Sequence, residues 1–307
     1  MIALVTGSTG FIGANLSRFL LKRGTEVHVI LRRNSNKWRI KDIESQLNIH
    51  NADITDAKKI DYIVKNIKPS VVYHTAAYGG FPFETDTKKI IKTNIFGTLN
   101  LIQSCIKHNI ECFVNTGTSS EYGIKNKPMS EDDLLDPLTI YGSTKAAISI
   151  ICKSQSTELP MITLRLFSPF GFYENKSRLI PQLSLSYLRN ESPMLASKKP
   201  VRDFIFIEDV MNAHKRASNP DLGGQIFNIG SGKQHTVEEV SKIIKKLTES
   251  DMNPVWNSAV SRKNEPKKWV ADISKSQKIL EWAPKYSLEK GLKRNVEWFK
   301  KNLELYN

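Results

Sequence analysis

The pair Tyr141 and Lys145 combines residue types and a spacing that suit proton transfer. The two residues stand four apart in IYGSTKAAISII, whose apolar pattern predicts a helix, so both side chains are expected on one face. A neighbouring ammonium favours the ionised phenol, and we therefore expect Lys145 to lower the pKa of Tyr141. Such a tyrosine can pass a proton to or from a sugar hydroxyl or carbonyl while a nicotinamide takes or gives a hydride.

A glycine-rich turn near the start of the sequence predicts the cofactor for this chemistry. Gly7, Gly10 and Gly13 lie between the strand-like run IALVT and the helical pattern FIGANLSRFLLKRG. The first glycine of such a turn permits its tight geometry, the second lets the backbone approach a pyrophosphate, and the third brings helix and strand together. The free amides of the helix N-terminus then meet the phosphate. The predicted cofactor contacts in this turn are Gly7, Thr9, Gly10, Phe11, Ile12 and Gly13.

The end of the second predicted strand bears on which dinucleotide is bound. An NAD site commonly has an acid here, about 20 residues after the glycines, for the ribose 2′-hydroxyl. The sequence instead has Leu31, Arg32 and Arg33 in EVHVILRRNSNK. Because an arginine pair can bind a 2′-phosphate, we expect NADP(H) in preference to NAD(H), which stays possible; alternatively, the pair is an exposed loop start. Asp53 and Ile54, at the end of the third predicted strand, are expected beside the adenine.

The elements that must position these residues alternate along the first half of the chain. Strand-like runs such as EVHVIL and SVVYHTAA alternate with helical patterns such as DAKKIDYIVKNI. Crossovers of this length join parallel strands and place helices on both faces of the sheet. We predict an α/β fold, a Rossmann-type doubly wound parallel sheet with a smaller C-terminal α/β substrate-binding lobe. Residues 1–168 are expected to form the dinucleotide-binding domain and 169–307 mainly the lobe, with 203–230 returning to the first domain.

Composition limits the class of protein. The chain has 307 residues, 40% of them hydrophobic and 25% charged, which is enough to bury a full core without crosslinks. No apolar run reaches the ~20 residues of a membrane span, and MIALV enters a strand without a leader before it, so we expect a cytoplasmic protein with no membrane partner. Three cysteines without CxxC spacing read as core residues, and six unclustered histidines predict no metal site.

The net charge of +14 raises the question of an anionic partner. The lysines are scattered along the chain, and no basic stripe is interleaved with aromatic residues as in a single-strand binder. We therefore expect solvated helix faces and no nucleic-acid partner. Attraction of an anionic small-molecule substrate is the alternative use of this charge.

Taken together, the motifs resemble those of the extended short-chain dehydrogenase/reductase family, in its nucleotide-sugar epimerase, dehydratase and ketoreductase branch. TGSTGFIG, HTAA, TNIFGTLNLI, NTGTSSEYG, YGSTK and LRLFSPFG follow one another in the order typical of that family. RLIPQL, PVRDFIFIEDV and FNIGSG extend the resemblance into the C-terminal part, so that it covers essentially the whole chain.

The resemblance implies roles for individual residues. Thr118 matches the Ser/Thr that hydrogen-bonds the reacting oxygen, Tyr141 the acid/base, and Lys145 its activator, which also holds the nicotinamide ribose. Further cofactor-site positions are Ala76, Ala77, Asn94 and Ser168. The positions implied for the substrate, a nucleotide-diphosphate sugar, are Thr118, Ser119, Ser120, Arg178, Arg202 and Arg262, and the alternative for each arginine is a surface ion pair.

Two departures from the family pattern narrow the reaction. Ser119 and Ser120 stand where the 4,6-dehydratases have an Asp-Glu pair, and neither serine can supply carboxylate chemistry, so dehydration is not expected. Ser168 replaces a common Asn, which weakens any inference about how the nicotinamide is oriented.

We expect NADP(H)-dependent reduction of a 4-keto, 6-deoxy nucleotide-diphosphate sugar, because the pair Arg32 and Arg33 points to NADPH. The alternative is an NAD-dependent nucleotide-sugar 4-epimerase, and a remote one is a cofactor-binding regulator without catalysis. A homodimer is expected through the helices NIFGTLNLIQSCI and YGSTKAAISIICKS, whose apolar faces can equally be core.

Overall fold

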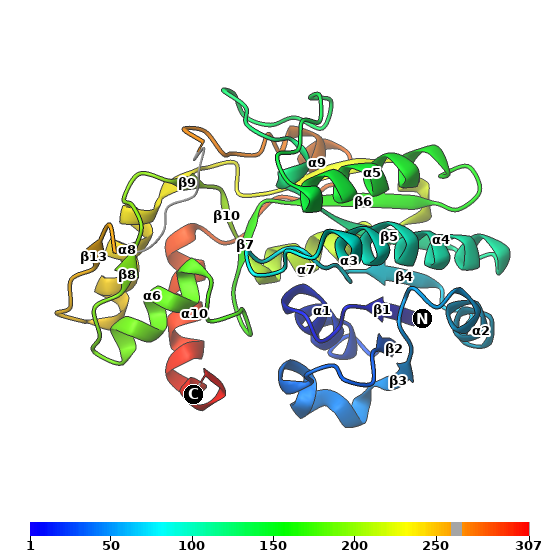
Figure 1. The fold of residues 1–307 in the computed structure, drawn as a ribbon, viewed down its shortest axis with the longest axis horizontal. Coiled ribbons are helices and arrows are strands. Elements are labelled where there is room, and N and C mark those ends of the chain that lie inside the picture. The colour runs from blue at the N-terminus through cyan, green and yellow to red at the C-terminus, as the bar shows by residue number, and fades with distance from the viewer. Residues whose placement is uncertain (259–265, 307) are drawn as a thin grey trace.

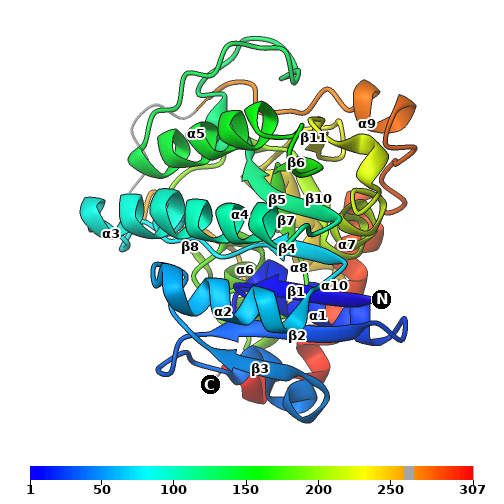
Figure 2. The ribbon, with the colours of Figure 1, turned by 90° about the vertical axis from the view of Figure 1, so that its right-hand side faces the viewer.

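The computed structural model describes residues 1–258 and 266–306, and its centre is a seven-stranded parallel sheet. The strands lie in the order β3-β2-β1-β4-β5-β6-β11 (Figure 2). Successive strands are added on one side of β1 up to β3 and on its other side from β4 onward. The strands are β1 (Ile2–Thr6), β2 (Glu26–Leu31), β3 (Asn48–Asn51), β4 (Val71–His74), β5 (Cys112–Thr118), β6 (Met161–Leu166) and β11 (Ile226–Ile229). This arrangement confirms the predicted Rossmann-type fold.

Helices cover both faces of the sheet, as its buried strands require. On one face lie α1 (Phe11–Leu21) and α7 (Ile207–Arg216), and on the other α2 (Ala57–Ile67), α4 (Thr98–Lys107) and α5 (Ile140–Ser154) (Figure 2). Each set buries its apolar stripe against strand side chains that point to that face, which gives two hydrophobic cores. The sheet is therefore closed to water on both faces.

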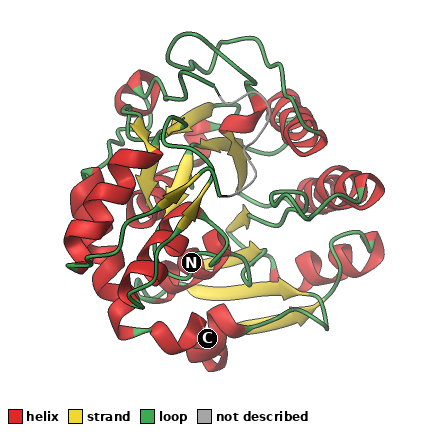
Figure 3. Ribbon diagram, turned by 60° about the vertical axis from the view of Figure 1, so that its left-hand side comes forward, coloured by secondary structure: helices red, strands yellow, loops and turns green. Residues whose placement is uncertain are grey.

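A smaller lobe gathers at one side of the sheet, away from α2 and α4 (Figure 1). Its helices α6 (Leu179–Leu188), α8 (Val237–Thr248) and α10 (Leu288–Lys301) pack on one another, and α10 also packs on β10 (Phe204–Phe206). Figure 3 shows how helices surround the strands. The remaining elements are η1 (Trp38–Gln46), α3 (Thr87–Ile91), η2 (Lys92–Gly97), η3 (Ser119–Glu121), β7 (Ser168–Phe170), β8 (Met194–Leu195), β9 (Val201–Arg202), η4 (Pro220–Leu222), β12 (His235–Thr236), β13 (Val255–Trp256), α9 (Ser274–Lys278) and η5 (Leu303–Tyr306).

The chain crosses between the two parts more than once. After β6 it enters the lobe, and it returns to place α7 against α1 and β11 beside β6 at the sheet edge. At the other end, Tyr306 donates a hydrogen bond of 2.9 Å to the backbone oxygen of Glu174 and packs edge-on against Trp38. Residues distant in sequence thus brace the loop that follows β7.

None of the helices in the described part of the chain is both long and apolar enough to cross a membrane. The three cysteines, Cys105, Cys112 and Cys152, are buried thiols in the core.

Candidate active site

The glycine turn between β1 and α1 leaves room for a ligand's phosphates. Gly7 has a φ of 70°, and its oxygen accepts a 2.8 Å hydrogen bond from the Gly10 amide. A Cβ on Gly7 would lie 2.6 Å from the Ala76 nitrogen, and one on Gly13 would lie 2.3 Å from the Gly7 oxygen. No side chain caps the start of α1, so its first amides are left for an anion. These residues fit a dinucleotide.

Two side chains outside the motif hold this turn in place. Arg39 donates from Nη1 to the Thr9 oxygen at 3.2 Å and from Nε to the Tyr173 oxygen at 2.7 Å. Asn15, in the second turn of α1, donates to the Phe172 oxygen at 2.8 Å. The loop after β7 is thereby fastened over the turn. Sequence reasoning missed Arg39, because it lies in an irregular stretch that carries no motif.

At the far end of the predicted cofactor cleft, Arg32 and Arg33 are exposed just beyond the buried end of β2. Asp53 accepts hydrogen bonds from the amide and hydroxyl of Thr55, at 2.9 and 2.8 Å. Burial opposes ionisation of Asp53, but these bonds and the charge of Arg32 bring its pKa below the usual value. Ile54 lies in the core, 7% exposed, where it packs beneath Gly97.

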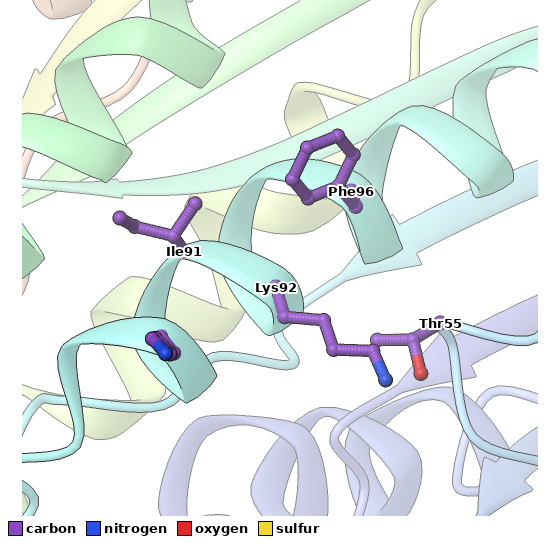
Figure 4. A pocket seen from close by; sticks show the side chains of 5 residues that line it. Thr55, Ile91, Lys92 and Phe96 are labelled. Carbon is purple, nitrogen blue, oxygen red and sulfur yellow. The ribbon is translucent and has the colours of Figure 1, made fainter.

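A surface hollow of about 470 Å³ lies next to this end of the cleft. Figure 4 shows Ile91, Lys92 and Phe96 on α3 and η2, with Thr55 on the neighbouring loop. Ile91 is 39% exposed and Phe96 58% exposed, so the hollow presents apolar side chains to the outside. Neither the glycine turn nor Tyr141 lines it. We therefore treat it as part of the outer surface and not of the catalytic cleft.

The structure brings the three predicted catalytic residues together. Thr118 ends β5, and Tyr141 and Lys145 lie in the first turns of α5, which Thr139 caps by accepting a 3.0 Å bond from the Gly142 amide. The Thr118 side chain lies close enough to the Tyr141 phenol to lower its pKa. A Cβ on Gly142 would lie 2.7 Å from the Ser120 oxygen, so this glycine lets α5 approach the end of β5.

The electrostatics differ from the expectation that Lys145 lowers the pKa of Tyr141. Burial raises the pKa of Tyr141 to about 12, the charge of Glu121 adds to this effect, and Arg178 and the Thr118 hydrogen bond oppose it. Lys145 is 4% exposed, and desolvation lowers its own pKa while Glu121 raises it. Burial is therefore the largest influence on Tyr141, and it acts in the direction opposite to the one expected from Lys145.

Asn94 lies beside the catalytic residues but is bonded to protein groups. It sits in η2, a single π-helical turn, and is 2% exposed. Its oxygen accepts from the Tyr78 amide at 2.9 Å, and its Nδ2 donates to the Tyr78 oxygen at 2.8 Å and to the Thr144 hydroxyl at 3.0 Å. Asn94 thus joins the loop after β4 to α5. Single π-helical turns of this kind are frequent at functional sites.

That loop borders the catalytic tyrosine. A Cβ on Gly80 would lie 3.9 Å from the Tyr141 ring. Glu84 fixes the loop by accepting from the amides of Gly79 and Phe81, at 3.0 and 3.1 Å. Arg178 reaches it from the start of α6, donates to the Gly80 oxygen at 2.7 Å and stacks over the Phe81 ring at 4.3 Å. Arg178 therefore reaches the substrate side of the cleft.

The other substrate-side predictions lie on different elements. The Ser119 hydroxyl accepts a 3.1 Å bond from the Trp269 indole and is 5% exposed, while Ser120 is partly exposed. Arg202, on β9, lies 5.6 Å from the centre of the Trp269 ring. Arg262 falls outside the described residues. Trp269 was missed because a lone aromatic in a segment without regular periodicity gives no sequence signal.

Three cofactor-side predictions are placed at strand ends. Ala76 donates its amide to the Thr6 hydroxyl at 3.3 Å, and Ala77 beside it is exposed. Ser168 begins β7, where its amide donates to the Asp203 oxygen at 2.9 Å, and it is partly exposed. All three positions follow the carboxyl ends of parallel strands, β4 for the two alanines and β6 for Ser168, at the edge where α/β sheets bind ligands.

A buried acid completes the site and was not singled out from the sequence. Glu121, in η3, is 0% exposed and accepts the Thr118 amide at 2.9 Å and the Arg165 Nε at 2.7 Å. Glu121 stands in TSSEYG, three residues after Thr118, and that spacing alone does not indicate a buried acid.

Comparison with known proteins gives a consistent result. The family model described as "NAD dependent epimerase/dehydratase family" matches residues 3–230. The UDP-glucuronate 4-epimerase of Thermodesulfobacterium geofontis is 30% identical over 317 residues, which cover 98% of this chain and 97% of that protein.

Solved structures agree over the full length. The UDP-glucose 4-epimerase of Thermotoga maritima, determined with UDP-glucose, matches with a TM-score of 0.90 and 29% identity over 99% of this chain and 100% of that chain. The UDP-glucuronic acid 4-epimerase of Bacillus cereus, in complex with UDP-glucuronic acid and NAD, matches with a TM-score of 0.87 and 27% identity over 98% and 99%.

Proposed function

The chain is an enzyme of the NAD-dependent epimerase/dehydratase family, and we propose that it is a nucleotide-sugar 4-epimerase that uses NAD. The observation that carries the proposal is the placement of Thr118 beside Tyr141, with Lys145 one turn along α5 and no carboxylate at positions 119 and 120. This set can move a proton at a sugar hydroxyl but lacks the acids for loss of water. UDP-sugars in the complexes of similar structures support a UDP-hexose or UDP-hexuronate as substrate.

The chain's residues divide the proton chemistry among them. Tyr141 takes the proton of the C4 hydroxyl when the sugar is oxidised and gives it back when the keto group is reduced. Thr118 donates a hydrogen bond to the same oxygen and stabilises its negative charge. Lys145, when protonated, favours the tyrosinate over the phenol. NAD, when bound, supplies a hydride acceptor that can return the hydride to the opposite face of the sugar.

For the cofactor, the glycine turn, the uncapped start of α1 and Arg39 form the phosphate end of the site. The NAD in the complexes of similar structures supports NAD over the NADP(H) that we expected from Arg32 and Arg33. The preference between the two is tested directly by comparing NAD and NADP binding in wild type and in Arg33→Ala. A site built for NAD loses little NAD affinity in this variant, whereas a 2′-phosphate site loses NADP affinity selectively.

Incubation with single nucleotide sugars tests the reaction. Purified protein is incubated with UDP-glucose, UDP-glucuronate and UDP-N-acetylglucosamine, and each mixture is analysed by NMR for the 4-epimer. We expect interconversion of one pair without net consumption of nicotinamide. Tyr141→Phe is expected to lose about 100-fold or more in kcat while it still binds NAD. A Tyr141→Phe variant with wild-type turnover would contradict the proposed role, and a wild type inactive on every sugar would contradict the proposed reaction.

The second candidate is the 4-ketoreductase that we expected from the sequence, and the observation in its favour is the exposed pair Arg32 and Arg33 where NAD sites carry an acid. It ranks behind the epimerase because the similar proteins described above are 4-epimerases. Consumption of NADPH with a 4-keto nucleotide sugar would reverse this order. Binding of NAD by a protein that turns over neither class would instead favour the non-catalytic regulator.

A homodimer is also proposed, with a second copy of this chain covering the apolar surface at α3, η2 and α5. Ile91, Phe96 and Ile150 are each at least 39% exposed, and α5 packs beside α3 and η2, so these side chains belong to neighbouring elements. Exposed large apolar side chains grouped in this way are typical of protein interfaces.

A further inference from the structure

Glu121 is a charged side chain with no access to solvent beneath the catalytic residues. Its carboxylate accepts the Thr118 amide at 2.9 Å with Oε1, and it is paired at 2.7 Å through Oε2 with the Arg165 Nε. Arg165 is 2% exposed and also donates to the Tyr122 hydroxyl at 2.9 Å. A Cβ on Gly117 would lie 2.6 Å from Glu121 Oε1, so the strand approaches the carboxylate too closely for any other residue.

The pairing with Arg165 makes burial of the carboxylate possible, because an isolated charge in the protein interior is strongly unfavourable. The pair in turn lies against the proton-transfer residues. Glu121 accepts a hydrogen bond from the backbone of Thr118, and the Thr118 side chain lies beside Tyr141. Lys145 follows Tyr141 on α5. Glu121 does not reach the cleft, so it can act on the reaction only through these residues.

We propose that Glu121 is a positioning residue for proton transfer: it fixes Thr118 through the backbone amide and supplies the buried negative charge that faces Tyr141 and Lys145. The inference rests on the proposed function only in assigning proton transfer to Tyr141. If Glu121 served only as a structural ion pair, its contact with Arg165 would be sufficient, and its bond to the Thr118 amide would not be needed.

The surroundings give the direction of the effect. The groups that face Tyr141 or Lys145 are Glu121, Glu84, Thr118, Arg178, Cys152 and His74. Burial is the largest influence on both residues, and the charge of Glu121 raises the pKa of each. Loss of that charge therefore lowers both pKa values and moves the activity profile as a whole toward acid.

Three variants separate charge from structure. Glu121→Gln keeps an oxygen for the Thr118 amide and removes the charge, but it leaves Arg165 buried without a partner. The double variant Glu121→Gln/Arg165→Met removes both charges and retains the 2.7 Å bond from the Tyr122 hydroxyl to Asn228, which protects folding. Glu131→Gln is the matched control, because Glu131 borders the same network through the Asn228 amide, at 2.7 Å, without facing Tyr141.

Two readouts are measured in each variant: the pH dependence of kcat and KM for epimerisation, and the titration of Tyr141 by NMR of carbon-13-labelled tyrosine. The Tyr141 signal is assigned with Tyr141→Phe. We expect the kcat profile and the Tyr141 titration to move to lower pH in Glu121→Gln and in the double variant, with KM unchanged. Glu131→Gln is expected to match wild type in both.

A folded double variant with the wild-type kcat profile and Tyr141 titration overturns the proposal, since rescue by removal of Arg165 is what a purely structural role predicts. An equal shift in Glu131→Gln overturns it as well. If the wild type epimerises no sugar, the proposed function fails, and the Tyr141 titration alone decides the role of Glu121.

Discussion

Replacing Gly13 by alanine places a methyl group where the glycine turn has no room for one. The new Cβ would lie 2.3 Å from the Gly7 oxygen and 2.7 Å from the Thr75 hydroxyl, and the first of these atoms belongs to a backbone already fixed by a 2.8 Å bond from Gly10. Forced overpacking of this kind costs about 1–3 kcal/mol, so thermal unfolding should shift down by roughly 2–5 °C for a chain of this length. The displaced turn should also lose NAD affinity.

Gly24→Ala is the matched control for this experiment. Gly24 has a φ of 70° and no atom within 4 Å of an added Cβ, so only backbone strain of about 1 kcal/mol is expected, with no effect on NAD binding. The assay is thermal unfolding with and without NAD, together with a direct NAD titration. A Gly13→Ala protein that binds NAD as tightly as Gly24→Ala would refute the reasoning that the close helix–strand contact forms the cofactor site.

The remaining predictions concern three other features. Asn94→Ala removes three hydrogen bonds, among them the one that the half-buried Tyr78 amide donates. We therefore expect the free energy of unfolding in urea to fall by about 2–3 kcal/mol, with a lower kcat, and an unchanged unfolding midpoint would contradict this assignment. Burial raises the pKa of Glu174 to about 8, so the folded state favours the protonated acid. The stability that this acid contributes is fully present below its ordinary pKa of about 4.5. It is lost as the pH rises from about 4.5 to about 8. Glu174→Gln should therefore be more stable than wild type at pH 9 by a few kcal/mol and equal at pH 4, and parallel stability curves for the two proteins would refute the shift. Phe96→Glu should convert the proposed dimer to a monomer in light scattering, and a wild type that is already monomeric would rule out the interface.

Local patterns in the sequence were sufficient to predict the sheet and the placement of Tyr141 and Lys145 on one helix. Strand–helix alternation predicts a parallel sheet because only a crossover can join parallel strands, and Tyr141 and Lys145 are joined by helical spacing alone. The structure places Thr118 against Tyr141, as the resemblance implied.

Features set by distant residues could not be predicted in this way. The pKa of Tyr141 depends on its burial and on Glu121, which no spacing rule connects to it. Trp269 reaches Ser119 across 150 residues of sequence, and Arg39 reaches Tyr173 across 134. These contacts depend on how the loops of two lobes meet, and local propensity carries no information about that.

The place of β11 at the sheet edge has a consequence for how the protein is made. Until Ile226–Ile229 arrives, β6 is the edge of the sheet, with its backbone donors and acceptors unpaired on one side and its side chains buried. About sixty residues separate the two strands in sequence, and at 5–20 residues per second the ribosome needs roughly 3–12 seconds to add them. During that interval the nascent chain exposes β6 as an unpaired edge strand. Polypeptides truncated near residue 168 would expose this edge permanently and would be candidates for chaperone capture or aggregation.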